Sequence, residues 1–230
     1  MSPAGTATPQ TAGFELRYPA GHDDSEGHRM RQGLAFAMGY LRNPRRVGAI
    51  APASKALAQA ILHEVMRSAP GTLIEVGAGT GAITRALLPA LGQVDRFMVI
   101  ERDPGFAQLL RRSFPDLEVL NHCATRLDAL DIEKHSPVTV VSSLPLLSMT
   151  RDEAHGCIDA MVALIEGRPG SRLIQYTYAS PHLRPFKDIP VGWRWRRAAS
   201  IWANLPPATV WTLEQASHPS HPSYSHNGFH

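Results

Sequence analysis

The strongest constraint on the fold is an apolar run that leads directly into a glycine-rich turn. Residues 73–81 read Leu-Ile-Glu-Val-Gly-Ala-Gly-Thr-Gly, and a stretch with helical periodicity follows. Glycine lets the backbone turn sharply and approach a ligand where a Cβ atom would collide. The acidic Glu75 just before the turn makes the segment more specific than a bare glycine pattern. We therefore expect a strand that ends at a ligand site.

Short β-rich runs alternate with helical stretches along most of the chain. This alternation predicts an α/β fold, namely a mostly parallel sheet with flanking helices. The expected strands are 73–76, 97–101, 117–120, 138–142 and 172–178, and the expected helices are 80–91, 104–114 and 151–166. Two further runs, 194–202 and 208–213, are joined through 205–207 and predict a closing C-terminal β-hairpin.

The 230 residues suffice for one sizeable core, so we expect one folded domain over 29–216. Residues 1–28 lack sustained periodicity and predict a flexible arm. Residues 217–230 repeat His, Pro and Ser and predict a flexible tail. Histidines in this tail could hold a metal ion, but a solvated tail is the favoured interpretation, and no metal site is expected.

Composition limits the class of protein. Lys and Arg total 23 against 20 Asp and Glu, a net charge of +3 that is far below that of a dedicated nucleic-acid binder. Cys123 and Cys157 cannot form a disulfide framework, which fits a reducing cytoplasm. No stretch approaches the roughly 20 apolar residues of a spanning helix. Any membrane contact is therefore expected to be peripheral.

A second acid stands at the end of the next expected strand. Glu101 follows Gly81 by 20 residues, a spacing at which a carboxylate can accept hydrogen bonds from ribose hydroxyls. The alternative is that Glu101 caps the helix that begins near Pro104. A nicotinamide dinucleotide would use a similar turn, but this turn lacks the Gly-x-Gly-x-x-Gly spacing of a pyrophosphate site.

These features resemble the class I S-adenosylmethionine methyltransferases over about 42–213, which implies their Rossmann-like fold and that cofactor. The family usually places an Asp against adenine where this chain has Cys123, so Asn121 or nearby backbone would have to substitute. A buried, inert Cys123 is the favoured interpretation. The implied cofactor-binding residues are Gly48, Ser54, Glu75, Gly77, Gly79, Thr80, Gly81, Glu101, Arg102, Cys123, Ala124 and Ser142.

The end of the fourth expected strand reads Ser-Ser-Leu-Pro-Leu-Leu from Ser142. A methyl acceptor amine needs oxygen acceptors that aim its lone pair, and Ser143 and the carbonyl of Leu144 are the candidates. A Pro-defined turn without chemistry is the alternative. RNA adenine dimethyltransferases carry an Asn-Leu-Pro-Tyr type sequence here. Leu146 offers no ring for base stacking, which favours an aliphatic amine.

The wider resemblance is to bacterial phospholipid N-methyltransferases, which convert phosphatidylethanolamine to phosphatidylcholine. It rests on residues 43–54, 142–149, 175–178 and 202–208. It implies a phospholipid headgroup and an anionic membrane surface as partners, at the cytoplasmic face of the membrane. It disfavours nucleic acid, and the sequence predicts no particular oligomeric state.

An apolar, basic segment fits that interpretation. Residues 29–63 contain six Lys or Arg and no acid, and 29–42 predicts an amphipathic helix. A lid that packs on the core is the alternative. The expected substrate or membrane residues are Arg31, Tyr40, Arg42, Arg45 and Arg46. A second basic and aromatic patch is expected from Arg184, Lys187, Arg194, Arg196 and Arg197 with Trp193 and Trp195.

Two tyrosines after the fifth expected strand complete the candidate site. Tyr176 and Tyr178 fall on one side of the strand by period-two alternation, where a ring can face the methylated ammonium. Packing beneath the hairpin is the alternative. Two other functions stay open: an RNA adenine dimethyltransferase, and a peripheral membrane-binding protein that has lost activity, for instance through the altered segment at Cys123.

Overall fold

The computed structural model describes residues 52–146, 149–178, 184–202 and 207–216. The expected arm 1–28, the amphipathic helix 29–42, the tail 217–230 and Leu147 lie outside the described residues. So do six expected site residues: Arg31, Tyr40, Arg42, Arg45, Arg46 and Gly48. Ser54 lies in a described helix, but its side chain is not described.

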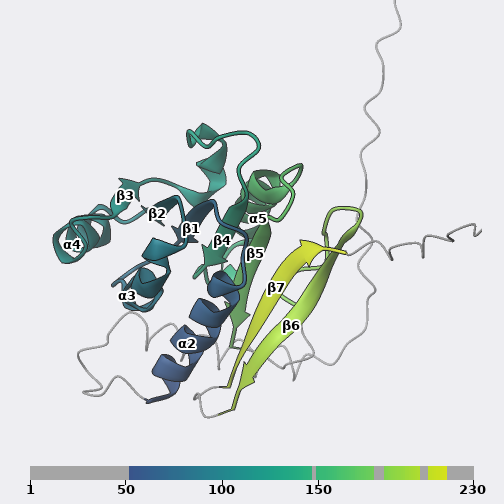
Figure 1. Cartoon of the computed structure of the whole chain (residues 1–230), viewed down its shortest axis with the longest axis horizontal. Coiled ribbons are helices and arrows are strands. Elements are labelled where there is room, and N and C mark those ends of the chain that lie inside the picture. Colours follow the sequence, from purple (N-terminus) through teal and green to yellow (C-terminus); the bar gives the residue numbers. More distant parts are fainter. Residues whose placement is uncertain (1–51, 147–148, 179–183, 203–206, 217–230) are drawn as a thin grey trace, which may run out of the picture.

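Seven strands form one sheet in the order β3-β2-β1-β4-β5-β7-β6 (Figure 1). The first five strands of this order are parallel to one another, whereas β7 is antiparallel to both β5 and β6. This arrangement confirms the expected parallel sheet with a closing hairpin. The strands are β1 (Thr72–Val76), β2 (Arg96–Glu101), β3 (Glu118–Asn121), β4 (Val138–Ser142), β5 (Arg172–Thr177), β6 (Trp193–Ile201) and β7 (Ala208–Gln215).

Helices cover both faces of the sheet. One face packs against α2 (Pro52–Met66), α3 (Ala82–Leu87) and α4 (Pro104–Ser113) through Leu73, Val99, Val141 and Ile174. The other packs against α5 (Arg151–Ile165) and the 3₁₀ helix η2 (Ala124–Ala129) through Ile74, Ile100, Val140 and Leu173. We call these the α2 face and the α5 face. Alternate residues of each central strand thus enter two separate apolar layers.

Two helices differ from expectation. The helix expected over 80–91 starts only at Ala82, because Gly81 adopts a left-handed φ of 82° as its N-cap, and it passes into the 3₁₀ helix η1 (Leu88–Gly92) at Pro89. Helix α2 was not expected at all. Leu57, Ile61 and Val65 form its buried stripe, but apolar residues also occupy its other sides, which weakens the helical period.

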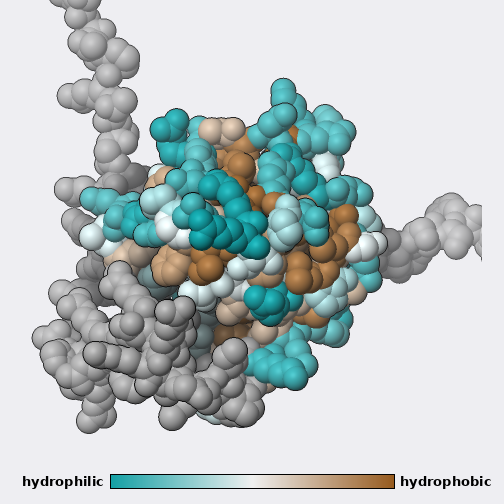
Figure 2. Space-filling view, turned by 90° about the vertical axis from the view of Figure 1, so that its left-hand side faces the viewer, coloured by the Kyte–Doolittle hydropathy of each residue, from teal (hydrophilic) through white to brown (hydrophobic). Residues whose placement is uncertain are grey.

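Outside the core, the described surface is mixed. On the side that carries α3 and α4, apolar and hydrophilic residues are interspersed (Figure 2), and Phe106 and Leu109 of α4 are partly exposed. This is the ordinary character of a protein surface. Within the described residues, no helix is both long and apolar enough to cross a bilayer.

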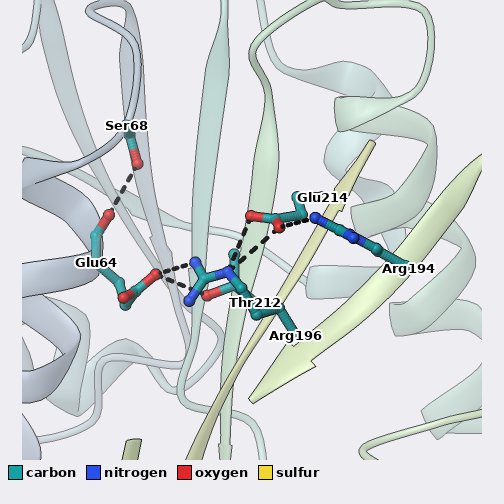
Figure 3. Close-up of polar contacts among 6 residues, drawn as sticks. All are labelled: Glu64, Ser68, Arg194, Arg196, Thr212 and Glu214. Carbon is teal, nitrogen blue, oxygen red and sulfur yellow. Dashed lines mark hydrogen bonds and ion pairs between the residues drawn. The ribbon is translucent and has the colours of Figure 1, made fainter. Parts of the chain in front are cut away.

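An ion-pair network fastens the hairpin to α2 (Figure 3). Arg196 of β6 lies 2.5 Å from the Glu64 carboxylate of α2 and 3.2 Å from Glu214 of β7. The Thr212 hydroxyl donates to the same Glu64 oxygen at 3.1 Å. Burial alone would raise the pKa of Glu64, but the hydrogen bond and charge of Arg196 lower it overall. Glu64 is therefore held as a carboxylate.

This network corrects the expected basic and aromatic patch. Trp193 and Trp195 are buried in the layer on the α5 face, and the Trp195 indole donates to the Phe186 carbonyl at 3.0 Å. Arg194 and Arg196 point to the opposite face and pair with Glu214. The two tryptophans and these two arginines thus stabilise the hairpin and do not form one exposed surface.

We expect Arg196→Met to destabilise the protein by about 1 to 3 kcal/mol at neutral pH, because it leaves the buried Glu64 carboxylate without its cation. The double variant Glu64→Gln/Arg196→Met should regain part of the loss. Urea unfolding measures both effects. Arg194→Met, which removes an exposed cation 3.5 Å from Glu214, is the control and should change stability by at most about 0.5 kcal/mol. An equal loss in all three variants would contradict the assignment.

Candidate functional site

The candidate residues of the described chain gather where the parallel strands end. Val76, Glu101, Ser142 and Gln175 are the last or nearly last residues of β1, β2, β4 and β5, which lie side by side in the sheet. In open parallel sheets, ligands bind at this carboxyl edge. The structure therefore brings Glu101 and Ser142, which the sequence pattern singled out, to one edge of the sheet.

The glycine turn is shaped by close neighbours. Gly77, Gly79 and Gly81 have left-handed φ values of 79°, 55° and 82°. A Cβ atom at Gly77 would lie 2.7 Å from Cδ2 of Leu144, and one at Gly81 would lie 2.6 Å from the Phe114 ring. At Gly79, by contrast, a Cβ atom would meet no atom within 4 Å. The turn is thus tight against the protein at its two ends and open at its centre, where Thr80 is exposed.

Glu101 fixes this open centre. Its side-chain oxygens accept hydrogen bonds from the backbone amides of Gly79 and Asp103, each at 2.8 Å. The carboxylate is buried, yet each oxygen has a second lone pair. The alternative role of Glu101 as the cap of α4 is wrong. The residue that caps this helix is Asp103, which accepts a hydrogen bond from the Phe106 amide. Glu101 is therefore positioned to accept further hydrogen bonds from a hydroxylated ligand above Gly79.

Glu75 is the most unusual group of the site. Its side chain is completely buried, and neither carboxylate oxygen has a hydrogen-bond partner of normal geometry within the described chain. Burial raises its pKa to about 7, which the nearby Thr84 opposes only in part. Such a carboxylate is costly for the folded protein unless a donor or cation reaches it. Thr84 offsets part of this cost, and a positively charged or hydrogen-bonding group would offset the rest.

At the end of the site where adenine is expected, the structure differs in part from the sequence prediction. Cys123 is partly exposed, not buried, and a hydrogen bond with the Thr125 hydroxyl, 3.1 Å away, lowers its pKa. The Asn121 amide donates to the backbone carbonyls of Glu101 and Arg102, so it ties β3 to the loop after β2. The Arg102 side chain is exposed and lies 3.7 Å from Glu153. Ala124 is buried at the start of η2.

The loop after β4 lies directly against the glycine turn. The Ser143 amide donates to the Val76 carbonyl at 2.9 Å, and Ser142 is buried at the end of β4. The Leu144 carbonyl accepts from the Gln175 amide at 3.3 Å and from the Leu146 amide at 2.9 Å, which uses both of its lone pairs. The Ser143 hydroxyl oxygen is buried without a partner of normal geometry in the described chain. The Tyr176 side chain also interacts with this hydroxyl, but a hydroxyl oxygen has two lone pairs, so Ser143 is the one of the two expected acceptors with capacity left.

The two tyrosines lie together, as period-two alternation predicts. Their rings make an edge-to-face contact, with centroids 5.7 Å apart and planes at 82°. Both pack against the layer on the α2 face, which contains Leu57 and Ile61 of α2. Burial raises the pKa of Tyr176 well above its ordinary value, so it stays neutral. Two polar residues of this region were missed, Thr84 beside Glu75 and Gln175 beneath Leu144. A polar residue in an otherwise apolar strand was the available signal for Gln175.

We expect Glu75→Gln to stabilise the ligand-free protein in a pH-dependent way. Between pH 4.5 and 7 the folded chain keeps a proton on Glu75 that the unfolded chain releases, so Glu75 lowers stability as pH rises through this range. Glutamine cannot ionise, so its advantage should be small near pH 5 and reach about 3 kcal/mol near pH 8. Urea unfolding across this range measures the difference. Glu166→Gln, at an exposed residue, is the control, and a constant advantage of Glu75→Gln at every pH would contradict the account.

Comparison with known proteins gives two kinds of sequence relative, and no family model matches the chain. The chain is 31% identical over 85 residues to the ornithine lipid N-methyltransferase of Singulisphaera acidiphila, covering 37% of this chain and 44% of the relative. It is also 31% identical over 85 residues to ribosomal RNA small subunit methyltransferase A of Chlorobium phaeobacteroides, covering 37% and 30%. The matched region spans less than half of either relative.

Solved structures resemble the chain over more of its length. The 1,6-didemethyltoxoflavin-N1-methyltransferase of Burkholderia thailandensis has a TM-score of 0.53 at 16% identity, covering 88% of this chain and 94% of its own. The N-methyltransferase NodS of Bradyrhizobium japonicum has a TM-score of 0.54 at 13% identity, covering 73% and 99%. Together with the strand order, these likenesses show that the chain has the Rossmann-like fold of the class I methyltransferases.

Proposed function

We propose that this protein is an S-adenosylmethionine-dependent N-methyltransferase whose acceptor is the amine of a membrane aminolipid, with phosphatidylethanolamine and its methylated derivatives as the first candidates. The observation that carries the proposal is one contact. Leu144 packs on Gly77, so the open glycine turn after β1 lies beside the buried Ser143 hydroxyl, whose oxygen has no hydrogen-bond partner of normal geometry in the described residues. The turn that is proposed to bind the cofactor therefore lies next to an oxygen that can accept an amine hydrogen.

The chain fits the proposed cofactor. Glu101 has lone pairs for ribose hydroxyls above the open Gly79, and the orphaned carboxylate of Glu75 suits the cationic end of an amino-acid moiety. Two of the structural neighbours were solved with S-adenosylhomocysteine bound. Cys123 replaces the acid expected at adenine, so backbone around Cys123 and Ala124 is the proposed contact there. The cofactor would supply an activated methyl group.

The residues around that turn would then act on the acceptor. In the proposed mechanism, the Ser143 oxygen accepts one amine hydrogen and so directs the amine lone pair toward the methyl group. The amine loses its proton to solvent or to its own phosphate. Tyr176 and Tyr178 present ring faces or edges near the growing ammonium, and an aromatic face stabilises such a cation by roughly 0.5 to 2 kcal/mol. The main catalytic contribution is orientation in a dry site.

Two observations favour an aliphatic lipid amine. Leu146, at the position where RNA adenine dimethyltransferases carry an aromatic residue, is buried in the layer on the α5 face and offers no stacking ring. One sequence relative is named for methylation of a lipid amine. The basic segment 29–46 would supply contact with an anionic membrane surface from the cytoplasmic side.

The second candidate is an RNA adenine dimethyltransferase. It is favoured by the sequence likeness to ribosomal RNA small subunit methyltransferase A, which recurs in several organisms. That function predicts salt-sensitive binding of structured RNA. An inactive peripheral membrane protein with the same fold is a third reading, which a measured cofactor affinity would exclude.

Glu101→Gln should weaken cofactor binding about tenfold or more, because one oxygen must then serve both the Gly79 amide and the ligand. Isothermal titration with S-adenosylhomocysteine measures the affinity. Glu118→Gln, at the sheet edge where Glu118 pairs with Arg96, is the control and should bind normally. Equal affinities for wild type and Glu101→Gln would exclude the proposed cofactor contact.

The acceptor is tested by supplying labelled S-adenosylmethionine with vesicles of phosphatidylethanolamine, with ornithine lipid vesicles, and with structured ribosomal RNA. We expect label in lipid as methylated headgroups, and Ser143→Ala should lower the rate about tenfold or more with unchanged cofactor affinity. Label in RNA alone would replace the proposal by the second candidate. Binding of cofactor without transfer to any acceptor would also count against it.

A further inference from the structure

Three buried polar atoms near the loop after β4 have no hydrogen-bond partner in the described chain. They are the carbonyl oxygen of the Gln175 side chain, the Thr177 hydroxyl oxygen and the Trp211 indole nitrogen. Their residues are 2%, 7% and 6% exposed, so solvent does not satisfy them. A single such atom is an ordinary defect, but buried polar atoms are normally paired. Three together indicate a site for a group that is not part of the described chain.

The sheet places the three on one surface. Gln175 and Thr177 follow Leu173 at period two, and Leu173 and Trp211 both belong to the layer on the α5 face. Gln175 and Trp211 are directly paired across β5 and β7. Side chains of such a pair lie about 5 Å apart at their Cβ atoms, and diagonal neighbours such as Thr177 and Trp211 are also within reach. The three side chains therefore form one cluster on the α5 face.

This cluster adjoins the proposed transfer site through Gln175. Gln175 is the register partner of Ser142, and its amide nitrogen donates to the carbonyls of Leu144 and Tyr176 at 3.3 and 2.9 Å. One amide hydrogen is thus used by the loop that carries Ser143, and the other by the backbone of β5 itself. Its remaining oxygen is an acceptor only, available to a donor such as an ammonium group.

A positively charged side chain lies at the far end of the row of paired residues that crosses β5, β7 and β6. Arg197 is paired with Trp211 across β6 and β7 and shares the α5 face with Trp195. Its side chain is exposed at the sheet edge, and it also interacts elsewhere in the chain. A β-bulge between Arg197 and Ala199 follows immediately. Bulges of this kind redirect side chains and are frequent beside active sites.

This row of paired residues therefore has a hydrogen-bond acceptor at one end and hydrogen-bond donors at the other. An acceptor, the Gln175 oxygen, lies nearest Ser143, and donors lie beyond it, namely the Trp211 indole and the Arg197 guanidinium. The Thr177 hydroxyl can serve either end. A group with a cationic head and an anion a few ångströms away matches this order. A bare phosphate would leave the Gln175 oxygen unpaired.

We infer that Gln175, Thr177, Trp211 and Arg197 form a headgroup subsite, in which Trp211 and Arg197 bind the phosphodiester of the acceptor lipid while Gln175 faces its amine. This inference rests on the proposed function and deepens it, since it selects a phosphate-bearing aminolipid over a phosphate-free one. The phosphate contact fixes the amine at a set distance from Ser143. These residues determine acceptor specificity, and Trp211 and Arg197 take no part in methyl transfer itself.

The test uses the full chain and two acceptors carried in phosphatidylglycerol vesicles, phosphatidylethanolamine and the phosphate-free amine oleylamine. Arg197→Met, Trp211→Phe and Thr177→Val are compared with wild type for kcat/KM on each acceptor, for S-adenosylhomocysteine affinity and for thermal unfolding. Arg194→Met is the matched control, because Arg194 lies on the same strand but on the α2 face, paired with Glu214.

We expect Arg197→Met and Trp211→Phe to lower kcat/KM for phosphatidylethanolamine about tenfold or more and to leave oleylamine and cofactor binding unchanged. A wild type that methylates phosphatidylethanolamine and not oleylamine also supports the subsite. Thr177→Val should lower the same rate without lowering the unfolding temperature, since it removes a hydroxyl that has no partner in the free protein.

Three results would overturn the inference. Variants that methylate phosphatidylethanolamine like wild type would remove the subsite and leave the proposed function intact. Equal losses on both acceptors, or a lower unfolding temperature for Thr177→Val with unchanged kinetics, would show that the cluster holds a structural water. A wild type that methylates neither lipid would refute the proposed function, and the subsite with it.

Discussion

The contact between Leu144 and Gly77 is the constraint on which the site depends. Without a Cβ atom at residue 77, the Leu144 side chain can lie directly on the turn after β1, and the hydrogen bond from the Ser143 amide to the Val76 carbonyl closes the same junction. Two loops from neighbouring parallel strands are thereby held at one height. An alanine at residue 77 would meet both a left-handed φ and a blocked position. The relation between the glycine turn and the loop after β4 is therefore set by backbone approach and not by side-chain chemistry.

Around this junction the protein keeps polar groups that destabilise it. Glu75 is fully buried with a raised pKa, and the Ser143 hydroxyl and the Gln175 oxygen are buried without partners in the described chain. An apolar residue of similar shape at any of these positions would suit the free fold better. These three residues lie at or near the carboxyl edge of β1, β4 and β5. A ligand that forms hydrogen bonds with these groups would recover the stability that they cost the free protein.

The sequence predicted the sheet well because its signals are local. Each parallel strand is buried on both faces and appears as a short continuous apolar run, so strand positions were correct to within one or two residues. Helix α2 was not predicted, because apolar residues on its other sides obscure the helical period of its buried stripe, Leu57, Ile61 and Val65. Glu75 and the glycines were predicted as site residues from their position after a strand, and Glu101 from its spacing, and the structure places them around one turn. Cys123 was expected to be buried, and its partial exposure depends on how η2 leaves β3, which no local pattern reports.

Strand β6 shows what the two-residue alternation of side chains along a strand predicts and what it does not. Its segment from Trp193 reads Trp-Arg-Trp-Arg-Arg, which as composition suggests one basic, aromatic surface. Alternation divides it: Arg194 and Arg196 turn to the α2 face, where Glu64 and Glu214 neutralise them, and Trp195 and Arg197 turn to the α5 face beside Trp211. Period two gives this division from sequence, but the acids that pair with two of the arginines come from α2 and β7. Which cations serve stability and which one lies beside the proposed headgroup subsite is therefore decided by strand order, because β7 inserts between β5 and β6 and brings both Glu214 and Trp211 to β6.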